Sequence, residues 1–181
     1  MKSVRKQKTV FLDRDGTMIE EVNFLSRIED LKLFHFTKQA VELLKSSGFR
    51  LIVLTNQSGI GRGIYDEEAM HTIHREMQVA LGNTIDGFYF CPHLPDAGCE
   101  CRKPRLQMIR DADQTFGVDF ENSWMIGDKT LDVETGEAAG IRTALVKTGY
   151  GVEHEKLLRQ KPEIIAENLF DAAQQIVSFQ N

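Results

Sequence analysis

The sequence has little of what would place it outside the ordinary globular proteins. Its 181 residues include three cysteines, four prolines and one tryptophan. So few cysteines exclude a disulfide-rich scaffold, and so few prolines exclude a proline-rich or collagen-like chain. No apolar run is long enough to span a membrane, and the basic N-terminus lacks a signal-peptide core. We therefore expect a single cytoplasmic domain over residues 1–181, without a membrane partner.

Basic residues are fewer than acidic ones: the chain has 22 Lys and Arg residues against 27 Asp and Glu residues, and its net charge is −5. An acidic chain without interleaved basic and aromatic residues is poorly suited to nucleic acid. Hydrophobic residues make up 41% of the chain, which allows a sizeable core without crosslinks. We expect a monomer that acts on a small molecule and has no nucleic-acid partner.

Short apolar runs of strand length alternate with segments of helical period. The predicted strands cover residues 9–12, 50–55, 87–91, 123–126, 142–146 and, more weakly, 163–166. The predicted helices cover residues 37–47, 66–81, 104–116, 131–139 and 169–179. Because this alternation is typical of an α/β fold, we expect a doubly wound parallel sheet with helices on both faces.

Two carboxylates one residue apart, Asp13 and Asp15, follow the first predicted strand. Side chains at positions i and i+2 of a strand point to the same face, so both carboxylates are expected to emerge together. Like charges this close are unfavourable unless a cation or a shared proton offsets them. A hard divalent ion such as Mg2+, which prefers oxygen ligands, is the expected cation. A simple acidic turn is the alternative that this pair alone leaves open.

Polar residues also follow other predicted strands, where open α/β sheets bind their ligands. Asp128 follows the fourth strand and either holds a cation or caps the next helix. Lys103 stands before a predicted helix start, which is unfavourable for the helix dipole and indicates a bound anion. The second strand leads into residues that either hold phosphate oxygens or simply end the strand, namely Thr55, Asn56, Gln57 and Ser58.

All the cysteines lie in one short segment that also contains a histidine. Its Cys-x-His and Cys-x-Cys pairs supply four potential metal ligands, Cys91, His93, Cys99 and Cys101. Four such ligands suffice for a tetrahedral Zn2+ site, and cytosolic chains rarely form disulfides. We expect a structural rather than a catalytic zinc, which would fix the loop just before Arg102 and Lys103. Buried or redox-active cysteines are the alternative.

In this order, the motifs resemble those of the haloacid dehalogenase (HAD) superfamily of phosphohydrolases. The sequence Asp-Arg-Asp-Gly-Thr at 13–17 corresponds to the first motif, Thr55 to the second and Lys103 to the third. Asp128, with Asp132, corresponds to the fourth. The resemblance covers nearly the whole chain and implies a HAD-like Rossmannoid sheet. The short spacings between the motifs leave no room for a cap domain, so the expected site is open.

The resemblance implies a two-step phosphatase reaction. Asp13 attacks phosphorus and forms an aspartyl-phosphate, while Asp15 protonates the leaving oxygen and then activates the hydrolytic water. The catalytic Mg2+ is expected on the Asp13 carboxylate, the Asp15 backbone carbonyl and Asp128. Thr55 and Lys103 are expected to stabilise the equatorial phosphate oxygens. Because Asp15 must be protonated in the first step, its crowded surroundings are expected to raise its pKa.

The cysteine motif narrows the resemblance to two groups of phosphatases. One removes the 7-phosphate of D-glycero-D-manno-heptose 1,7-bisphosphate, and the other hydrolyses histidinol phosphate. Residues 59–63 resemble a Gly-x-x-Arg-Gly segment of the first group, whose arginine suits a second phosphate. We therefore expect the heptose bisphosphate as substrate, with Arg62, Arg102 and Lys129 among its contacts. Histidinol phosphate as substrate and a solvated Arg62 are the alternatives.

Two more distant hypotheses complete the set. An open site also suits a polynucleotide 3′-phosphatase, although the acidic composition disfavours it. The other hypothesis is a zinc-stabilised binding module that has lost catalytic activity. It predicts that some catalytic residues are missing, whereas all the motif residues are present.

Residues 21–24 and the cysteine loop are the expected walls of the site. Outside the motifs, His74 is interpreted as a surface or packing residue and Trp124 as a core residue.

Overall fold

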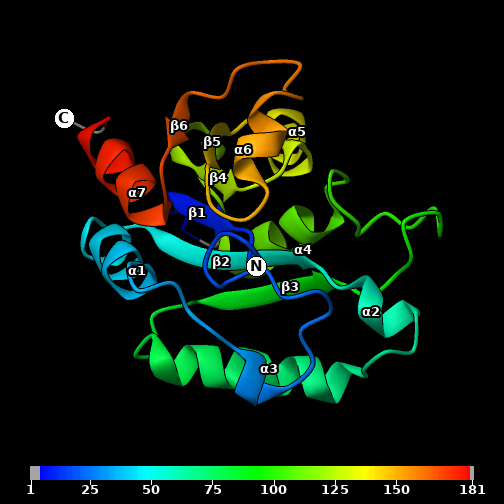
Figure 1. Ribbon diagram of the computed structural model, residues 1–181. Helices are drawn as coiled ribbons and strands as arrows, with labels where there is room; N and C mark the ends of the chain where they lie inside the picture. Colours follow the sequence, from blue (N-terminus) through cyan, green and yellow to red (C-terminus); the bar gives the residue numbers. More distant parts are fainter. Residues whose placement is uncertain (1–4, 180–181) are drawn as a thin grey trace.

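The computed structural model describes residues 5–179. Six parallel strands form one sheet in the order β3-β2-β1-β4-β5-β6 (Figure 1). The strand order reverses between β1 and β4, which confirms the predicted doubly wound arrangement. The strands are β1 (Thr9–Leu12), β2 (Arg50–Asn56), β3 (Gly87–Cys91), β4 (Trp124–Gly127), β5 (Arg142–Val146) and β6 (Ile164–Ala166).

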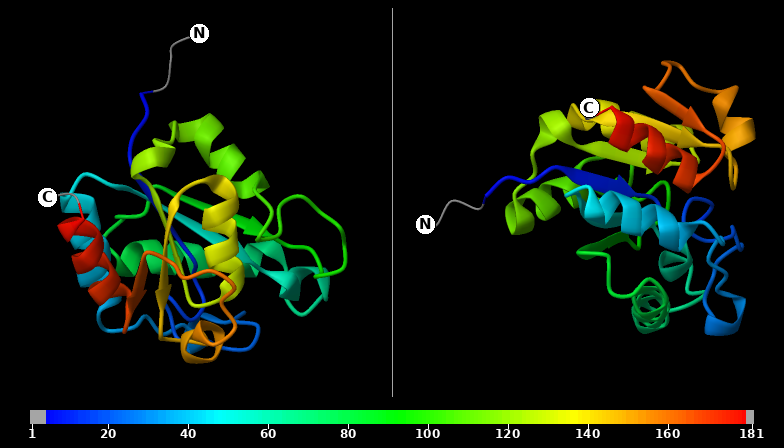
Figure 2. Two further views of the ribbon diagram at one scale, coloured as in Figure 1. Left: turned by 90° about the horizontal axis from the view of Figure 1, so that it is seen from above. Right: turned by 90° about the vertical axis from the view of Figure 1, so that its left-hand side faces the viewer.

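Helices cover both faces of the sheet (Figure 2). One face packs against α1 (Thr37–Ser46), α3 (Glu67–Ala80) and α7 (Leu169–Ser178). The opposite face packs against α4 (Gln107–Phe116) and α5 (Thr130–Ala139). Two shorter helices, which follow β2 and β5, are α2 (Ser58–Gly61) and α6 (Gly151–Glu155). The sheet is thus the middle of three layers, and both of its faces are withdrawn from water.

β1 occupies the centre of the sheet, and its side chains are buried on both faces. Val10 and Leu12 belong to the core under α1, α3 and α7, whereas Phe11 belongs to the core under α4. A parallel strand that is buried on both faces has a continuous apolar sequence, and for this reason β1 can be predicted from the sequence. The Asp13 N–H still donates to Ile126 O at 2.9 Å, so the rigid sheet sets the position of Asp13.

Element boundaries differ from the predicted ones near Lys103. α4 begins at Gln107 rather than at residue 104, and a turn closed by Arg105 N–H on Arg102 O precedes it. The prediction that Lys103 stands at a helix start is therefore wrong, and the helix dipole does not explain this lysine. α2 and α6 are absent from the sequence-based prediction because helices this short show no clear period.

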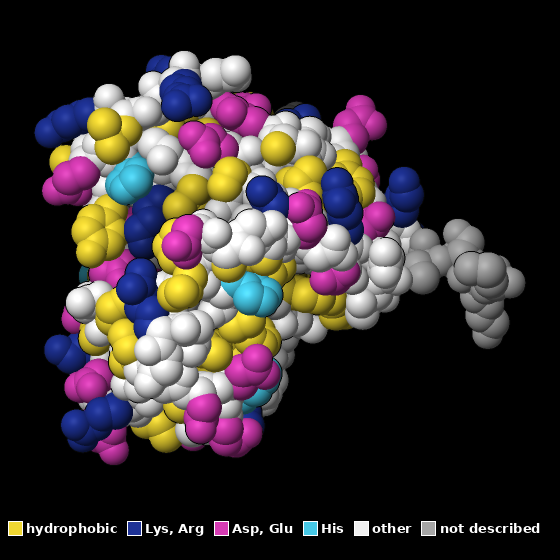
Figure 3. Space-filling view, turned by 90° about the vertical axis from the view of Figure 1, so that its right-hand side faces the viewer, with side chains coloured by type: hydrophobic (Ala, Val, Ile, Leu, Met, Phe, Trp, Pro, Cys, Tyr) yellow, Lys and Arg dark blue, Asp and Glu magenta, His cyan; other side chains and the backbone are white. Residues whose placement is uncertain are grey.

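No cap domain is inserted among residues 5–179. Between β1 and α1 the chain forms one 3-10 helix (Ile28–Asp30) and isolated β-bridges that pair Ile19 with Asp15 and Leu33, and α2 joins β2 to α3. Within the same residues, none of the helices has the length and apolar character needed to cross a membrane. Acidic and basic side chains are interspersed on the face in Figure 3, without a broad area of one sign. In this part of the chain, loops and the short helix α2 cover the carboxyl ends of the strands at the site, without a cap domain.

Substitution of Gly136 by alanine should destabilise the protein, although alanine is the better helix former. Gly136 lies on the buried side of α5, where an added Cβ would come within 2.3 Å of Thr143 Cγ2 and 3.0 Å of Met125 Cβ. We expect Gly136→Ala to lower the free energy of unfolding by about 1–3 kcal/mol, as over-packed cores do. Urea denaturation measures this change. The exposed neighbour Glu137→Ala is the control and should change it by less than about 0.5 kcal/mol; unchanged or higher stability of Gly136→Ala would contradict the expectation.

Candidate active site

A cavity of about 290 Å3 lies at the carboxyl ends of the strands. Segments far apart in the sequence meet there, because β1 and β2 are neighbours and the chain before α4 reaches across them. The polar residues that line it are Asp13, Arg14, Asp15, Glu21, Asn23, Thr55, Asn56, Gln57, Ser58, Tyr65, Arg102, Lys103 and Lys129. Of the predicted phosphate- and substrate-binding residues, all except Arg62 line this cavity.

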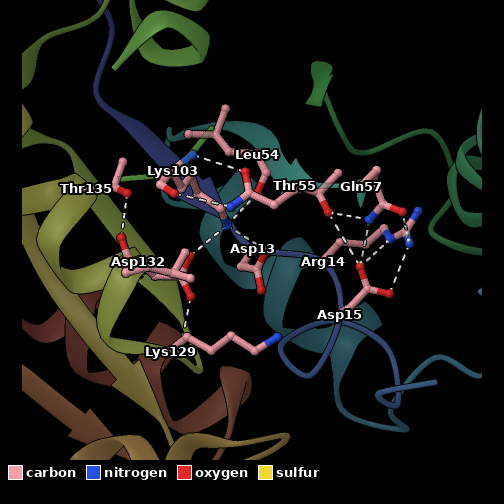
Figure 4. Close-up of polar contacts among 12 residues, drawn as sticks. Asp13, Arg14, Asp15, Leu54, Thr55, Gln57, Lys103, Lys129, Asp132 and Thr135 are labelled. Atoms are coloured by element: carbon pink, nitrogen blue, oxygen red, sulfur yellow. Dashed lines mark hydrogen bonds and ion pairs between the residues drawn. The ribbon is translucent and has the colours of Figure 1, made fainter. Parts of the chain in front are cut away.

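Lys103 holds the Asp13 carboxylate in place. Its ammonium nitrogen Nζ lies 2.7 Å from Asp13 Oδ1, 2.6 Å from Asp132 Oδ1 and 2.9 Å from Leu54 O (Figure 4). Lys103 and both carboxylates are buried, and a buried charge needs partners of opposite sign. An ammonium group has three N–H donors, and here the protein uses all of them. Lys103 therefore orients Asp13 and supplies positive charge next to it, and the carboxylates, rather than a helix end, account for its burial.

The pKa values of this cluster reflect the crowding of charge. Burial alone would lower the pKa of Lys103, but the Asp13 and Asp132 carboxylates outweigh burial and raise it. Burial raises the pKa of Asp132 to about 6, against the opposing charge of Lys103. Asp132 Oδ2 also accepts the Lys129 N–H at 3.1 Å, which ties the start of α5 to this cluster. Asp13 and α5 are therefore linked through Lys103 and Asp132.

Asp128 lies beside Asp13 with one oxygen unused. Its Oδ2 accepts the Tyr150 N–H at 2.8 Å, whereas its Oδ1 is buried without a hydrogen-bond partner among residues 5–179. Burial and the Asp13 charge raise the pKa of Asp128 to about 8. A Cβ on Gly16 would come within 2.3 Å of Asp128 Oδ2, so the loop after β1 needs glycine here. Carboxylate oxygens of Asp13, Asp128 and Asp132 lie within 4.8 Å of one another, and such a group fits a divalent cation such as Mg2+.

Asp15 is bound by its own neighbour in the sequence. Arg14 donates to both of its carboxylate oxygens, through Nε at 2.9 Å and Nη2 at 3.0 Å, and Gln57 Nε2 donates at 3.0 Å (Figure 4). Burial would raise the pKa of Asp15, but the Arg14 charge and hydrogen bonds outweigh burial and lower it. The expectation of a raised pKa is therefore wrong. That expectation considers only the crowded carboxylates, whereas the folded chain places a guanidinium on Asp15.

Lys129 and Glu21 form an ion pair at the side of the cavity. Lys129 Nζ lies 3.1 Å from Glu21 Oε2 and 4.9 Å from the centre of the Tyr150 ring. Burial would lower the pKa of Lys129, but the nearby carboxylates, chiefly Asp13 and Asp128, raise it. Lys129 is therefore a cation at neutral pH, placed where an anionic group in the cavity would meet it.

The expected walls are present only in part. Residues 21–25 line the cavity, whereas the cysteine loop contributes Arg102, just after its last cysteine. Arg62 is exposed, and its guanidinium lies 5.8 Å from the centre of the Phe24 ring, which does line the cavity. An added Cβ on the neighbouring Gly61 would come within 2.7 Å of Pro92 O, so this segment packs closely on the cysteine loop. Arg62 thus stands at the rim, outside the cavity proper.

The structure assembles the predicted metal-ligand set in the cysteine loop. Its ligand atoms come within 4.8 Å of one another in Cys91, His93, Cys99 and Cys101. The Cys101 sulfur lies 3.0 Å from that of Cys91, 3.6 Å from that of Cys99 and 3.2 Å from His93 Nδ1. Zinc–sulfur bonds of about 2.3 Å give a tetrahedron with edges of about 3.8 Å, so these sulfurs, which lie 3.0 to 3.6 Å apart, would move slightly apart around a bound ion. All the cysteines are free thiols, so the cluster fits a zinc ion rather than a disulfide.

Comparisons with known proteins agree with this geometry. A family model described as HAD-hydrolase-like matches residues 100–172. A D-glycero-beta-D-manno-heptose-1,7-bisphosphate 7-phosphatase of Photorhabdus laumondii is 39% identical over 173 residues, which cover 90% of this chain and 91% of that protein. A D-glycero-alpha-D-manno-heptose-1,7-bisphosphate 7-phosphatase of the same organism is 37% identical over 179 residues, or 91% and 94% of the two chains. The chain belongs to the HAD superfamily of phosphatases.

A solved structure supports the same family assignment. The crystal structure of D,D-heptose 1,7-bisphosphate phosphatase from B. bronchiseptica, complexed with magnesium and phosphate, matches with a TM-score of 0.88 and 30% identity. The match covers 95% of this chain and 99% of that one. This HAD phosphatase therefore shares the capless α/β fold expected from the sequence, and its activity is the hydrolysis of phosphate esters.

Two residues of the site, Arg14 and His74, have no role in the sequence-based hypothesis. His74 is buried, and its Nε2 lies 3.2 Å from Arg14 Nη1. The interpretation of His74 as a packing residue is right in part, since its ring stacks on Phe88. The sequence does contain an indication that His74 is buried, because His74 lies on the same face of α3 as Ile73 and Met77. A polar residue on an apolar helix face needs a buried partner.

Substitution of Lys103 by methionine should strongly destabilise the protein, and more so at high pH. The change leaves Asp13 and Asp132 buried without their cation, which costs about 3–5 kcal/mol for such pairs. The pKa of Asp132 is already raised to about 6 in the folded state, and loss of Lys103 raises it further. A raised folded-state pKa means that stability is lost as the pH rises through that value. Denaturation in Mg2+-free buffer should therefore show a larger loss at pH 8 than at pH 5.

The control for this experiment is Lys45→Met. It breaks the more exposed Lys45–Asp86 pair, for which a loss of no more than about 1 kcal/mol is expected. A loss of similar size in both variants, or a Lys103→Met penalty that grows at low pH, would contradict the account of this charge cluster.

Proposed function

We propose that this HAD phosphatase removes the 7-phosphate of D-glycero-D-manno-heptose 1,7-bisphosphate through an aspartyl-phosphate on Asp13, with Mg2+ as cofactor. The observation that carries the proposal is the buried Asp13 carboxylate, which lines the cavity and is oriented by Lys103 at 2.7 Å. A carboxylate fixed in this way is a competent nucleophile toward phosphorus. The substrate is inferred from relatives of 37% and 39% identity that are named for this activity.

In the proposed mechanism the chain's own groups divide the work. Asp13 attacks phosphorus, while Asp15 gives a proton to the leaving oxygen and later takes one from the hydrolytic water. Lys129 and Thr55 bind phosphate oxygens, and Lys103 offsets charge beside the nucleophile without a free donor of its own. Asp13, Asp128 and the Asp15 carbonyl would hold Mg2+, which when bound offsets phosphate charge and favours in-line transfer.

The open rim supports a substrate with two phosphates. The cavity is covered by loops and by the start of α2, without a cap domain, so a sugar bisphosphate can place its 7-phosphate at Asp13 and extend outward. Arg62 stands at this rim against Phe24, and we propose that it binds the second phosphate. Arg102, which lines the cavity, is proposed as a further substrate contact together with Asn56, Gln57 and Ser58.

Phosphate release from heptose 1,7-bisphosphate and from histidinol phosphate, side by side with Mg2+ at equal concentrations, tests the substrate. We expect a clear preference in kcat/KM for the bisphosphate, because Arg62 has a partner only in that substrate. A preference for histidinol phosphate would move the enzyme to that substrate and leave Arg62 without a role. If neither is hydrolysed well, the substrate proposal fails, whereas membership of the phosphatase family stands.

In the same assay, Asp13→Asn should lower turnover by more than about a thousandfold, because the amide cannot attack phosphorus. Asn keeps the size of the side chain, and circular dichroism checks that the variant is folded. Mg2+-dependent turnover that survives in pure Asp13→Asn would exclude Asp13 as the nucleophile.

We also propose that the cysteine cluster binds one structural Zn2+. Its four ligand atoms already converge in the structure, and the loop contains no helix or strand of its own to hold it in shape. A bound zinc would fix the loop whose end carries Arg102 and Lys103. Zinc would therefore support the site without taking part in the reaction.

Metal analysis of the purified protein should give about one zinc per chain, and Cys101→Ser should lose it and lower the melting temperature. Asp96→Ala, an exposed change in the same loop, is the control and should keep both. Protein without zinc, or a Cys101→Ser variant with the zinc content of the wild type, would overturn the zinc proposal.

A further inference from the structure

Arg14 is bound in more ways than an ion pair requires. Its Nε and Nη2 donate to the two oxygens of Asp15, at 2.9 and 3.0 Å. Nη2 donates also to Gln57 Oε1 at 3.0 Å, and Nη1 donates to His74 Nε2 at 3.2 Å. Figure 4 shows Arg14 with Asp15 and Gln57. The side chain is 1% exposed. The first two contacts would neutralise Asp15, and the other two fix the plane of the guanidinium.

His74 is a rigid acceptor for this guanidinium. An arginine side chain has only donors, so Nε2 of His74 must accept and the ring proton must lie on Nδ1. Burial and the Arg14 charge lower the pKa of His74 to about 3, which keeps the ring neutral. The ring stacks on Phe88 of β3, with 4.6 Å between the ring centres and 22° between the planes. Elements β3 and α3 therefore determine where Arg14 lies.

Gln57 ties the same group to the loop after β2. Its Oε1 accepts from Arg14 and from the Tyr65 hydroxyl at 2.5 Å, while its Nε2 donates to Asp15 Oδ2 and to Thr55 Oγ1. Burial raises the pKa of Tyr65 to about 12, so its hydroxyl stays protonated and donates. The amide of Gln57 is thus oriented by its partners, and it faces Asp15 with its donor side.

The two oxygens of Asp15 are held unequally. Oδ2 accepts from Arg14 Nε and Gln57 Nε2, and Thr55 Oγ1 lies 3.4 Å from it. Among the described residues, Oδ1 accepts only from Arg14 Nη2. Two donors occupy both lone pairs of Oδ2, whereas Oδ1 keeps one lone pair that can take a proton while its hydrogen bond from Arg14 Nη2 remains.

We propose that Arg14, held by His74 and Gln57, is a positioning residue that anchors Oδ2 of Asp15 so that Oδ1 carries the transferred proton. This inference rests on the proposed function, in which Asp15 is the general acid and base. In the first step an Asp13 oxygen bonds to phosphorus, the ester P–O bond breaks, and the Oδ1 proton passes to the ester oxygen. In the second step water bonds to phosphorus, the P–O bond to Asp13 breaks, and a water proton returns to Oδ1.

The chemistry of the leaving group separates positioning from plain stability. An alkoxide needs a proton from Asp15 as it leaves, whereas p-nitrophenolate leaves as a stabilised anion. The ratio kcat/KM reports the steps up to release of the alcohol, so it is insensitive to hydrolysis of the aspartyl-phosphate. A misplaced Asp15 should therefore lower kcat/KM for an alkyl phosphate and spare p-nitrophenyl phosphate, while a loss of folded enzyme lowers both equally.

Three variants test the network with two esters: p-nitrophenyl phosphate and whichever of heptose 1,7-bisphosphate and histidinol phosphate the wild type hydrolyses better. His74→Phe keeps a ring against Phe88 but removes the acceptor, and we expect kcat/KM for the alkyl ester to fall by about tenfold or more. The aryl ester should change by less than about twofold. His74→Gln restores an acceptor and should recover most of the loss. Arg14→Lys keeps the charge without the fork geometry and should behave like His74→Phe, which covers the case that His74→Phe does not fold.

Equal losses on both esters, or a His74→Gln variant as impaired as His74→Phe, would overturn the positioning role. Asp15→Asn, measured in parallel, distinguishes this failure from failure of the proposed function. If Asp15→Asn loses the alkyl ester selectively and the Arg14 and His74 variants do not, only the positioning inference is wrong. If Asp15→Asn shows no selective loss, Asp15 is not the general acid. Both the positioning inference and the role of Asp15 in the proposed function are then wrong.

Discussion

Crowding of carboxylates at one edge of the sheet is the constraint on which the rest of this site depends. Asp13, Asp128 and Asp132 are each 5% exposed or less, and Asp15 follows two residues after Asp13. Buried like charges at such distances are unfavourable without compensation. The chain compensates group by group, with Lys103 between Asp13 and Asp132 and a guanidinium on Asp15. The buried Oδ1 of Asp128, without a partner among residues 5–179, marks where a further cation fits.

The parallel sheet brings these carboxylates together. β1, β2 and β4 are neighbours at the centre of the sheet, so their carboxyl ends deliver Asp13, Thr55 and Asp128 to one place. Lys103 comes from outside the sheet and reaches Leu54 O at the end of β2. The cysteine loop lies immediately before this lysine, so the loop's conformation and the lysine's position are linked through the backbone.

In the proposed function, the residues that carry out the reaction lie deep in the cavity, whereas the residue proposed to select the substrate lies at its rim. Asp13 and Lys103 are buried and interlocked, so small changes there disturb several charges at once. Arg62 is exposed at the rim, and among residues 5–179 its ring contact is with Phe24, so it can change without disturbing the charge cluster. Such an arrangement allows one phosphoryl-transfer site to serve different phosphate esters within a family.

The sequence alone determined the α/β alternation, the strand ends that carry the site and the four possible zinc ligands. These depend on residues close together in the chain, such as the apolar run before Asp13 and the spacing around Cys99. Only the tertiary structure decided that the pKa of Asp15 is lowered, that Lys103 is held by carboxylates rather than by a helix end, and that Arg62 lies outside the cavity. His74 reaches Arg14 from a helix sixty positions away, at a point set by packing of α3 on the sheet. Electrostatics depends on distances through space, and those exist only once the layers have packed.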